Sequence, residues 1–156
     1  MSPVTARELD LAITPAQPGE VPSIAALLQA AQLPHEDFAP HLAHFLVARD
    51  AGGAVVGAIG AEVHGRDALL RSLVVAPPFR KHGLGAGLVR SLEAAAADWG
   101  VQHWWLLTTT AETFFKKRGF VVTPRQAAPA VIAATAEFRG LCPSVAVCLS
   151  RERRSR

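Results

Sequence analysis

The sequence predicts a mixed α/β domain in which helices cover both faces of a central sheet. Two long apolar runs, at 55–64 and 69–75, follow each other across a turn, as the strands of a hairpin do. A helix with one apolar face follows a glycine-rich turn, and shorter strands and helices then alternate to the end of the chain. A hairpin followed by crossover connections indicates a sheet with both antiparallel and parallel strand pairs.

Hydrophobic residues in the first half of the chain recur with the periods of strands and helices in turn. Prolines and glycines separate these runs, because they interrupt regular structure. The elements predicted in this half are a strand at 9–13, a helix at 24–31, a short helix at 35–44 and strands at 46–49, 55–64 and 69–75. The last of these strands is almost wholly apolar, so we expect it to be central and covered on both faces.

The second half begins with Pro77 and Pro78, which end the apolar strand. The turn at 83–87 then opens a helix whose apolar stripe continues to Trp99, and Gly100 is a typical residue for its C-terminal end. The elements predicted after it are a strand at 103–108, a short helix at 111–118, a strand at 120–123, a helix at 129–138 and a strand at 144–149. We expect residues 1–150 to form one domain and the basic residues 151–156 to form a disordered tail.

Length and composition exclude several classes of protein. The chain has 156 residues, of which 50% are hydrophobic and 19% are charged, a balance that excludes an intrinsically disordered chain. No apolar run is long enough to span a bilayer, and residues 1–10 lack the apolar core of a secretory signal. The two cysteines, Cys142 and Cys148, predict buried free thiols of a reducing compartment, so we expect a cytoplasmic protein.

The net charge of +3 is distributed unevenly. Basic residues cluster at 80–82 and 116–118, each beside a glycine and a helix end, and again in the C-terminal tail. Such small clusters suit a compact polyanion, whereas nucleic acid needs a larger basic face. We therefore expect neither a nucleic acid nor a membrane as a partner.

The glycine-rich turn after the apolar strand is the segment that indicates chemistry. The N-terminus of a helix has N–H groups without partners and a partial positive charge, and glycines let a phosphate approach the backbone. A Walker loop is excluded, because no Lys–Ser/Thr pair follows the second glycine, and the spacing does not fit the dinucleotide fingerprint. The remaining layout is R-x-x-G-x-G at Arg80–Gly85, which predicts a pyrophosphate site.

This loop lies after a V-x-P strand end, and the segment A-x-x-F-F-x-x-x-G-F follows at 111–120. Together these motifs resemble the GNAT superfamily of acetyl-CoA-dependent N-acetyltransferases, over residues 9–149. The resemblance implies a mostly antiparallel sheet with a splayed pair of central strands. The segments 106–112 and 137–143 resemble, more narrowly, a branch found with arsenic-resistance operons.

The resemblance implies acetyl-CoA as co-substrate. We expect no metal, because His41 and His44, which lie three positions apart, have no further ligand at a fitting spacing. The pantetheine arm would add to the backbone of Leu73, Val74 and Val75 as a strand does. The pyrophosphate would be bound by Arg80, Lys81, His82, Gly83, Leu84, Gly85 and Ala86. Phe114, Phe115 and Lys117 would border the pantetheine and adenine end. A plain core position is the alternative for both phenylalanines, and we favour it for Phe114.

For the base that accepts the proton of the amine we favour Glu62, alone or with His64. Both residues lie on the same face of the strand 55–64, and a carboxylate in an apolar strand is costly unless it is solvated or partnered. The alternative is that both side chains point to solvent. Many relatives carry an acidic residue at the position of Leu69 instead, and this chain does not.

Many relatives place a tyrosine at the position of Phe115 to protonate the leaving thiolate, and this chain contains no tyrosine. Water or a hydroxyl group would have to replace it, and the candidates are Thr109, Thr110 and Ser144. Thr109 is the preferred catalytic residue and Thr110 a candidate substrate contact. The alternative for Thr110 is a cap of the following helix.

Arg71 interrupts the apolar strand, and a buried guanidinium needs an anion. One interpretation is that Arg71 binds an acidic group of the substrate; the other is an internal salt bridge to Glu62 or Glu137. The expected substrate contacts are Arg71, Ser72, His41 and Thr110.

The sequence thus predicts an enzyme that transfers an acetyl group to the amine of a small, anionic, amino-acid-like molecule. If the narrower branch applies, that molecule bears arsenic or phosphorus. Two alternatives stay open: a non-catalytic acyl-CoA-binding sensor, which the missing tyrosine and Leu69 favour, and an N-acetyltransferase acting on peptides or proteins. Pairing of two copies through sheet edges or C-terminal strands is left open by the resemblance.

Overall fold

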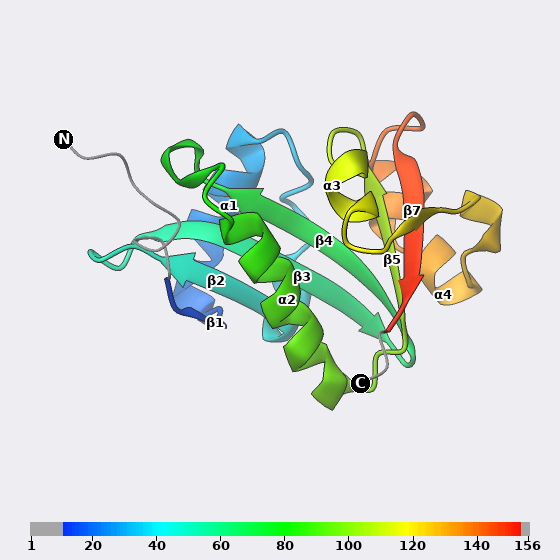
Figure 1. Ribbon diagram of the computed structural model, residues 1–156, viewed down its shortest axis with the longest axis horizontal. Coiled ribbons are helices and arrows are strands. Elements are labelled where there is room, and N and C mark those ends of the chain that lie inside the picture. Colours follow the sequence, from blue (N-terminus) through cyan, green and yellow to red (C-terminus); the bar gives the residue numbers. More distant parts are fainter. Residues whose placement is uncertain (1–10, 154–156) are drawn as a thin grey trace. The chain divides into compact units, whose positions relative to one another are not determined.

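The computed structural model describes residues 11–153 (Figure 1). The chain divides into two compact units. Of the described residues, the first unit comprises those up to Ala61 together with Ser72–Ala95, and the second comprises Glu62–Arg71 and those from Ala96 onward. Strands β3 (Val55–His64) and β4 (Asp67–Val75) contribute residues to both units.

The strands are β1 (Ile13–Pro15), β2 (Phe45–Arg49), β3, β4, β5 (His103–Thr108), β6 (Val121–Val122) and β7 (Val147–Glu152). In the part of the chain that the structure describes, they form a seven-stranded sheet with the order β1-β2-β3-β4-β5-β7-β6. β4 and β5 are parallel, whereas β1–β2, β2–β3, β5–β7 and β6–β7 are antiparallel pairs. The predicted α/β fold with a mixed, mostly antiparallel sheet is therefore confirmed.

The α-helices are α1 (Val21–Ala30), α2 (Leu84–Ala96), α3 (Glu112–Lys116) and α4 (Ala130–Ala133). Short 3₁₀ turns occupy Pro18–Glu20, Ala39–His44, Pro77–Phe79, Ala97–Trp99 and Arg125–Ala127, and a π-helical turn occupies Glu137–Leu141. Among residues 11–153, no helix has the length and hydropathy needed to cross a bilayer.

In the first unit, α1 and α2 pack on opposite faces of β3 (Figure 1). On one face, Ala58 belongs to a buried cluster with Ile24 and Leu28 of α1. On the other face, a Cβ at Gly57 would lie only 3.2 Å from the side chain of Leu88 in α2. Because alternate residues of a strand point to opposite faces, the missing side chain at Gly57 lets α2 approach the sheet closely.

The second unit has its own core, formed by Leu69, Trp105, Ile132 and Cys148. β5 lies between β4 and β7 and pairs with β7 along its whole length, but its pairing with β4 joins only Asp67–Leu69 to His103–Trp105. The indole N–H of Trp105 donates to the Asp67 carboxylate at 3.0 Å. Burial of each large apolar side chain contributes roughly 1.5–3 kcal/mol, so this small cluster stabilises the unit substantially.

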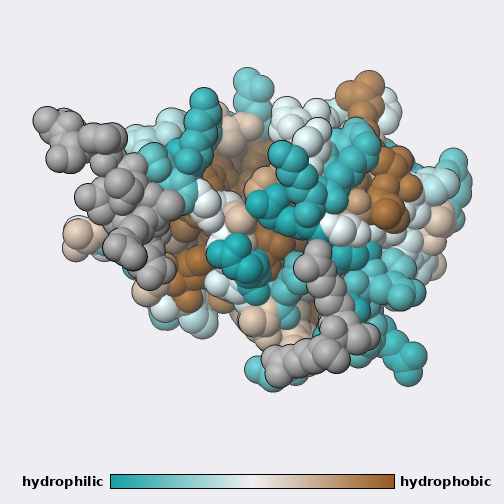
Figure 2. Space-filling model, viewed as in Figure 1, coloured by the Kyte–Doolittle hydropathy of each residue, from teal (hydrophilic) through white to brown (hydrophobic). Residues whose placement is uncertain are grey.

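The surface of the protein alternates between polar and apolar groups. Figure 2 shows hydrophobic groups interspersed with hydrophilic side chains on the face that carries α2. In the second unit, the large hydrophobic side chains exposed to solvent are Val121, Val122, Val131, Leu141 and Val145.

Several predicted elements differ from the structure in their bounds, among them the first strand and the helix at 129–138. The first strand is Ile13–Pro15 rather than 9–13, of which residues 9 and 10 lie outside the described residues. Pro15 is tolerated because β1 is an edge strand, where no neighbour needs its missing N–H group. The predicted helix at 129–138 breaks after α4, because the Thr135 hydroxyl donates to the Ile132 carbonyl at 2.7 Å and competes with helical bonding.

The predicted tail begins two residues too early. Arg151 and Glu152 belong to β7, and Arg151 is buried. Its Nη1 donates to the carbonyl of Arg118 at 2.6 Å, and its guanidinium carbon lies 4.8 Å from the centre of the Phe120 ring. The carbonyl and the aromatic face stabilise the cation inside the unit, so the strand continues past Leu149. Residues 154–156 of the predicted tail lie outside the described residues.

Candidate active site

The glycine-rich loop of the first unit connects β4 to α2. The Nε of Arg80 donates to the Val75 carbonyl at 2.8 Å, which directs this side chain back toward the end of β4. Lys81 and Gly83 both adopt left-handed φ angles, of 68° and 85°. The Gly83 carbonyl accepts the N–H of Gly87 at 3.0 Å, so helical hydrogen bonding starts at Gly83 and the preceding amides are not used by the helix.

The loop is accessible to a ligand. Arg80, Lys81 and Gly83 are exposed, and a Cβ on Gly83 would meet no atom within 4 Å. The amides at the N-terminus of the 13-residue helix α2 favour an anion, and the neighbouring guanidinium and ammonium groups add formal positive charge. The arrangement can therefore hold a phosphate group, as the sequence predicts.

The other predicted cofactor residues in the first unit differ in exposure. Val74 and Leu84 are buried, and Val74 belongs to the cluster beneath α1. Only the backbone of these two residues could contact a ligand. The half-buried residues of the predicted set are Leu73, Val75, His82, Gly85 and Ala86.

Phe115 occupies a core position, which is the alternative that the sequence leaves open for this residue. Phe115 is buried, and its ring packs edge-on against Phe120 with 5.3 Å between the ring centres. Phe114 is half-buried, with the guanidinium carbon of Arg118 3.6 Å from its ring centre. Lys117 is exposed directly after α3. The second unit therefore uses Phe115 for packing, which explains an aromatic residue there without a ligand.

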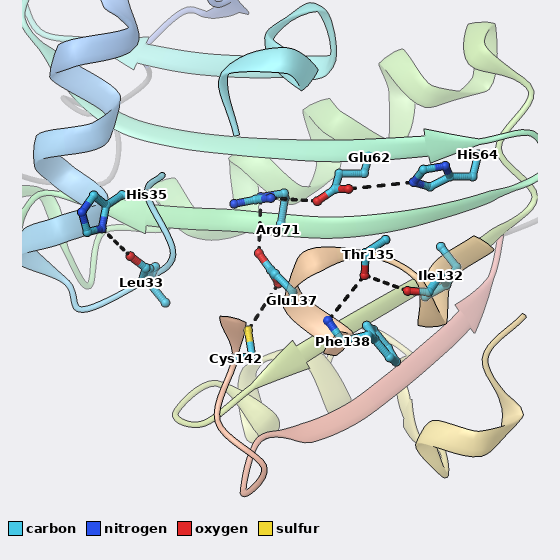
Figure 3. Close-up of polar contacts among 10 residues, drawn as sticks. All are labelled: Leu33, His35, Glu62, His64, Arg71, Ile132, Thr135, Glu137, Phe138 and Cys142. Atoms are coloured by element: carbon cyan, nitrogen blue, oxygen red, sulfur yellow. Dashed lines mark hydrogen bonds and ion pairs between the residues drawn. The ribbon is translucent and has the colours of Figure 1, made fainter. Parts of the chain in front are cut away.

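The second unit buries three charged groups that share contacts (Figure 3). Arg71 of β4 donates through Nη1 to Oε2 of Glu62 in β3 at 2.7 Å, and its Nε lies 3.3 Å from Oε2 of Glu137. The Arg71 side chain is 0% exposed, and each carboxylate side chain is 5% exposed. Of the two interpretations of Arg71, the structure shows the internal salt bridge, and it involves both glutamates. A guanidinium buried in this way does not present itself to a substrate.

Two further groups extend this cluster at its ends. His64 is 31% exposed, and its Nε2 lies 3.8 Å from Oε1 of Glu62. The Cys142 thiol donates to Oε1 of Glu137 at 3.5 Å. Burial, together with the charge of Glu137, raises the pKa of Cys142 to about 12, because both disfavour the thiolate. Cys142 is therefore a neutral hydrogen-bond donor near neutral pH.

We call His64, Glu62, Arg71, Glu137 and Cys142 the charged cluster. Figure 3 shows that Glu62 lies between His64 and Arg71, and that Glu137 lies between Arg71 and Cys142. Glu62 does not point to solvent, which removes that alternative for this residue. The cluster joins β3, β4 and the segment after α4, although these segments are far apart in the sequence.

The hydroxyl groups near α3 have a different arrangement from the one expected. The side chain of Thr108 accepts the N–H of Thr110 at 3.3 Å and that of Ala111 at 2.9 Å. Thr108, and not Thr110, is therefore the residue that satisfies the amides before α3, and a threonine four positions ahead of the first residue of the helix is the signal for it. Thr109, Thr110 and Ser144 are exposed.

The remaining predicted substrate contacts lie in the first unit. Ser72 is buried and adopts a left-handed φ of 63° within β4. His41 is half-buried in the turn Ala39–His44, and its charge, after burial, is the second cause that lowers the pKa of His44. Within residues 11–153, no three His, Cys, Asp or Glu side chains come together in a way that could hold a metal ion.

Comparisons with known proteins identify the family to which the chain belongs. A family model described as an acetyltransferase (GNAT) domain matches residues 41–122, which is more than half of the chain and includes the glycine-rich loop. No curated protein matches the chain.

Several solved structures have the same fold. N-acetylglutamate synthase from Neisseria gonorrhoeae, solved with coenzyme A and N-acetyl-glutamate, superposes with a TM-score of 0.81 at 20% identity, over 93% of this chain and 35% of that chain. This chain therefore spans about a third of the synthase. A GNAT-family acetyltransferase from Staphylococcus aureus Mu50 gives 0.76 at 16% identity, over 92% of this chain and 99% of its own.

A third structure, Rv2747 from Mycobacterium tuberculosis, was solved with coenzyme A. It gives a TM-score of 0.75 at 22% identity, over 90% of this chain and 98% of its own. At these identities the structures show a shared fold, and the family model adds the match in sequence. The open glycine-rich loop and the mixed seven-stranded sheet are consistent with the family match, and the match shows that the chain belongs to the GNAT family of acetyltransferase domains, which are acyltransferases.

Proposed function

We propose that this protein transfers an acetyl group from acetyl-CoA to the amine of a small molecule. The observation that carries the proposal is the open loop at Arg80–Ala86, whose amides and cations suit a pyrophosphate, in a chain of the GNAT family. The backbone of Leu73–Val75 would bind the pantetheine arm, and Lys117 would lie toward the adenine. The solved relatives that contain coenzyme A support this choice of co-substrate.

In the proposed reaction, the neutral amine attacks the thioester carbonyl carbon, a C–N bond forms and the C–S bond breaks. The enzyme gains most by holding the two reactants together, since well-oriented pairs reach effective molarities of about 10⁵–10⁸ M. Glu62 would accept the proton of the ammonium group through His64, because Glu62 is buried and His64 is only half-buried. Because the chain has no tyrosine, water or the exposed hydroxyl of Thr109 would protonate the thiolate.

The acceptor is proposed to be a small, anionic, amino-acid-like molecule. The relative from Neisseria was solved with N-acetyl-glutamate, which is the acetylated form of such a molecule. The segments 106–112 and 137–143 favour an acceptor that bears arsenic or phosphorus. Since Arg71 is engaged inside the second unit, Ser72, His41 and Thr110 are the remaining proposed contacts. Two free thiols suit a reducing compartment, so we place the protein in the cytoplasm.

The loop is tested by isothermal titration of acetyl-CoA into the wild type, Gly83→Val and Gly53→Val. Both glycines adopt left-handed φ angles, of 85° and 88°, and a Cβ on either would meet open space. The two variants therefore carry the same backbone strain, but only Gly83→Val places a side chain where phosphate would approach. We expect at least a tenfold weaker affinity for Gly83→Val and an unchanged affinity for Gly53→Val. Equal affinities in both variants would remove the loop from the site.

Turnover is tested by thiol release with a panel of amines, half of them bearing carboxylate, arsonate or phosphinate groups. Release with the anionic amines supports the proposed acceptor class. Binding of acetyl-CoA without release on any amine would instead support the acyl-CoA sensor, which the missing tyrosine favours. Release with peptides alone would support an N-acetyltransferase acting on proteins.

A further inference from the structure

We propose that Arg71 and Glu137 are positioning residues that orient the carboxylate of Glu62 toward His64 for proton transfer. This inference rests on the proposed acetyl transfer, in which Glu62 is the base. It also gives a role to the segment 137–143, which the sequence singles out and which takes no part in the proposed binding of acetyl-CoA at the glycine-rich loop.

The two oxygens of the Glu62 carboxylate face different partners (Figure 3). Oε2 accepts the Nη1 hydrogen bond of Arg71 at 2.7 Å, and Oε1 lies 3.8 Å from Nε2 of His64. A charge-assisted hydrogen bond on one oxygen restricts rotation of the carboxylate group. Arg71 therefore directs the other oxygen toward His64, which is the member of the charged cluster that reaches solvent.

Glu137 in turn holds the plane of the Arg71 guanidinium. The donors of this group lie in one rigid plane, so contacts at Nη1 and Nε together determine its orientation. Oε2 of Glu137 forms an ion pair with Nε of Arg71, with 3.3 Å between the atoms, while Oε1 of Glu137 accepts a hydrogen bond from the Cys142 thiol at 3.5 Å. The positions of Glu62, Arg71 and Glu137 are thus mutually dependent.

Stability alone does not account for three buried charges. Burying an ion costs several kcal/mol, and apolar residues of the same volume often stabilise a fold as well or better. The groups facing Glu62 are His64 on β3, Arg71 on β4, and Glu137 with the neutral Cys142 from the segment after α4. Arg71 is the cation that contacts Glu62 directly, and Glu137 is a second anion on the same cation, so the two neighbours of Glu62 carry opposite charges.

The test is the pH profile of kcat/KM in Arg71→Met and Glu137→Gln. The acidic limb of this profile is the pH range in which kcat/KM falls as the pH is lowered. For Arg71→Met, we expect this limb to move to higher pH by about 1–3 units, because a cation beside the proposed base is lost. For Glu137→Gln, it should move downward, because a like charge is lost. Arg71→Lys keeps the charge without the planar fork, so kcat should fall while the limb stays near that of the wild type.

Arg49→Met is the matched control, since it breaks an arginine–glutamate pair of the first unit, whose Nε and Oε2 atoms lie 2.6 Å apart. It should leave the acidic limb in place. Opposite movements in Arg71→Met and Glu137→Gln support the inference, and Glu137→Gln decides alone if Arg71→Met fails to fold. The inference is overturned if the acidic limbs of both variants stay at the wild-type pH, or if both move in the same direction. A wild type that binds acetyl-CoA and acetylates no amine overturns the proposed function instead, and this inference falls with it.

Discussion

The two units each contain an arginine–glutamate ion pair, and the two pairs differ in partner number and in contact with water. In the first unit, Arg49 binds both oxygens of Glu20, with distances of 2.6 and 2.7 Å, and the side chains are 27% and 17% exposed. In the second unit, Arg71 is shared by Glu62 and Glu137 and is fully buried. An arginine–glutamate ion pair is therefore partly exposed to water in one unit and fully buried in the other.

The ion pair in the first unit connects two elements of that unit. Arg49 lies at the end of β2, and it also donates to the Thr14 hydroxyl and the Pro15 carbonyl of β1. Glu20 directly precedes α1, so one guanidinium connects the edge of the sheet to the start of a helix. Arg49 and Glu20 are partly exposed to water, so removing one of them leaves the other solvated and should lower the stability only slightly. In the second unit, Arg71 has two anionic partners and none of the three side chains has more than slight access to water. Removing one of these charges should therefore lower the stability more.

The largest expected effect is on stability in Arg71→Met. Removing the guanidinium leaves two carboxylates buried beside each other, and the free energy of unfolding should fall by about 3–5 kcal/mol. Urea denaturation measures this loss. Glu137→Gln is the matched control, because it keeps one carboxylate opposite the cation and should cost clearly less. A loss in Arg71→Met as small as that in Glu137→Gln would show that the buried charges are not coupled.

A smaller effect is expected in Arg49→Met, at about 1 kcal/mol. Its hydrogen bond to Glu20 lowers the pKa of that carboxyl, so the folded state binds the proton less firmly than the unfolded state. The contribution of the pair is present above the unfolded value of about 4.3 and is lost as the pH falls through the lower folded value. Thermal unfolding from pH 7 to pH 3 should show wild type and variant converging at the acidic end. Parallel curves would contradict this.

The smallest effect is expected from the thiol at the end of the charged cluster. The folded pKa of Cys142, about 12, lies above the unfolded value, so the folded state holds the proton more firmly. This contribution is present below about pH 8.5 and is lost as the pH rises toward 12. The stability advantage of the wild type over Cys142→Ala should therefore be larger at pH 7 than at pH 10. Cys148 is present in both proteins and cancels; an advantage independent of pH would argue against a buried neutral thiol.

Several features were predictable because they depend on neighbours in the sequence. The bounds of β3 and β5 follow from their apolar runs and flanking turns, and they agree with the prediction. The glycine-rich loop follows from the order strand, prolines, glycines and helix. The common face of Glu62 and His64 follows from the period of a strand, and their contact at 3.8 Å agrees with it.

Other features could not be chosen from the sequence, because they depend on segments that meet only after folding. A buried arginine needs an anion, but whether Arg71 would find that anion in a substrate, in Glu62 or in Glu137 depends on where the segment after α4 lies. The burial of Arg151 depends in the same way on the Arg118 carbonyl and the Phe120 ring. Without knowledge of these partners, a basic residue near the end of a chain is predicted to belong to a solvated tail.

The amino-acid order by itself determined the class of the fold, the loop suited to phosphate and the pairing of a carboxylate with an imidazole along one strand, since each arises from local periodicity and local turns. Only the tertiary structure decided that Arg71 is shared by two glutamates and that Phe115 is a packing residue. The physical reason is that burial and electrostatic partners are properties of the space around a side chain, and distant segments fill that space.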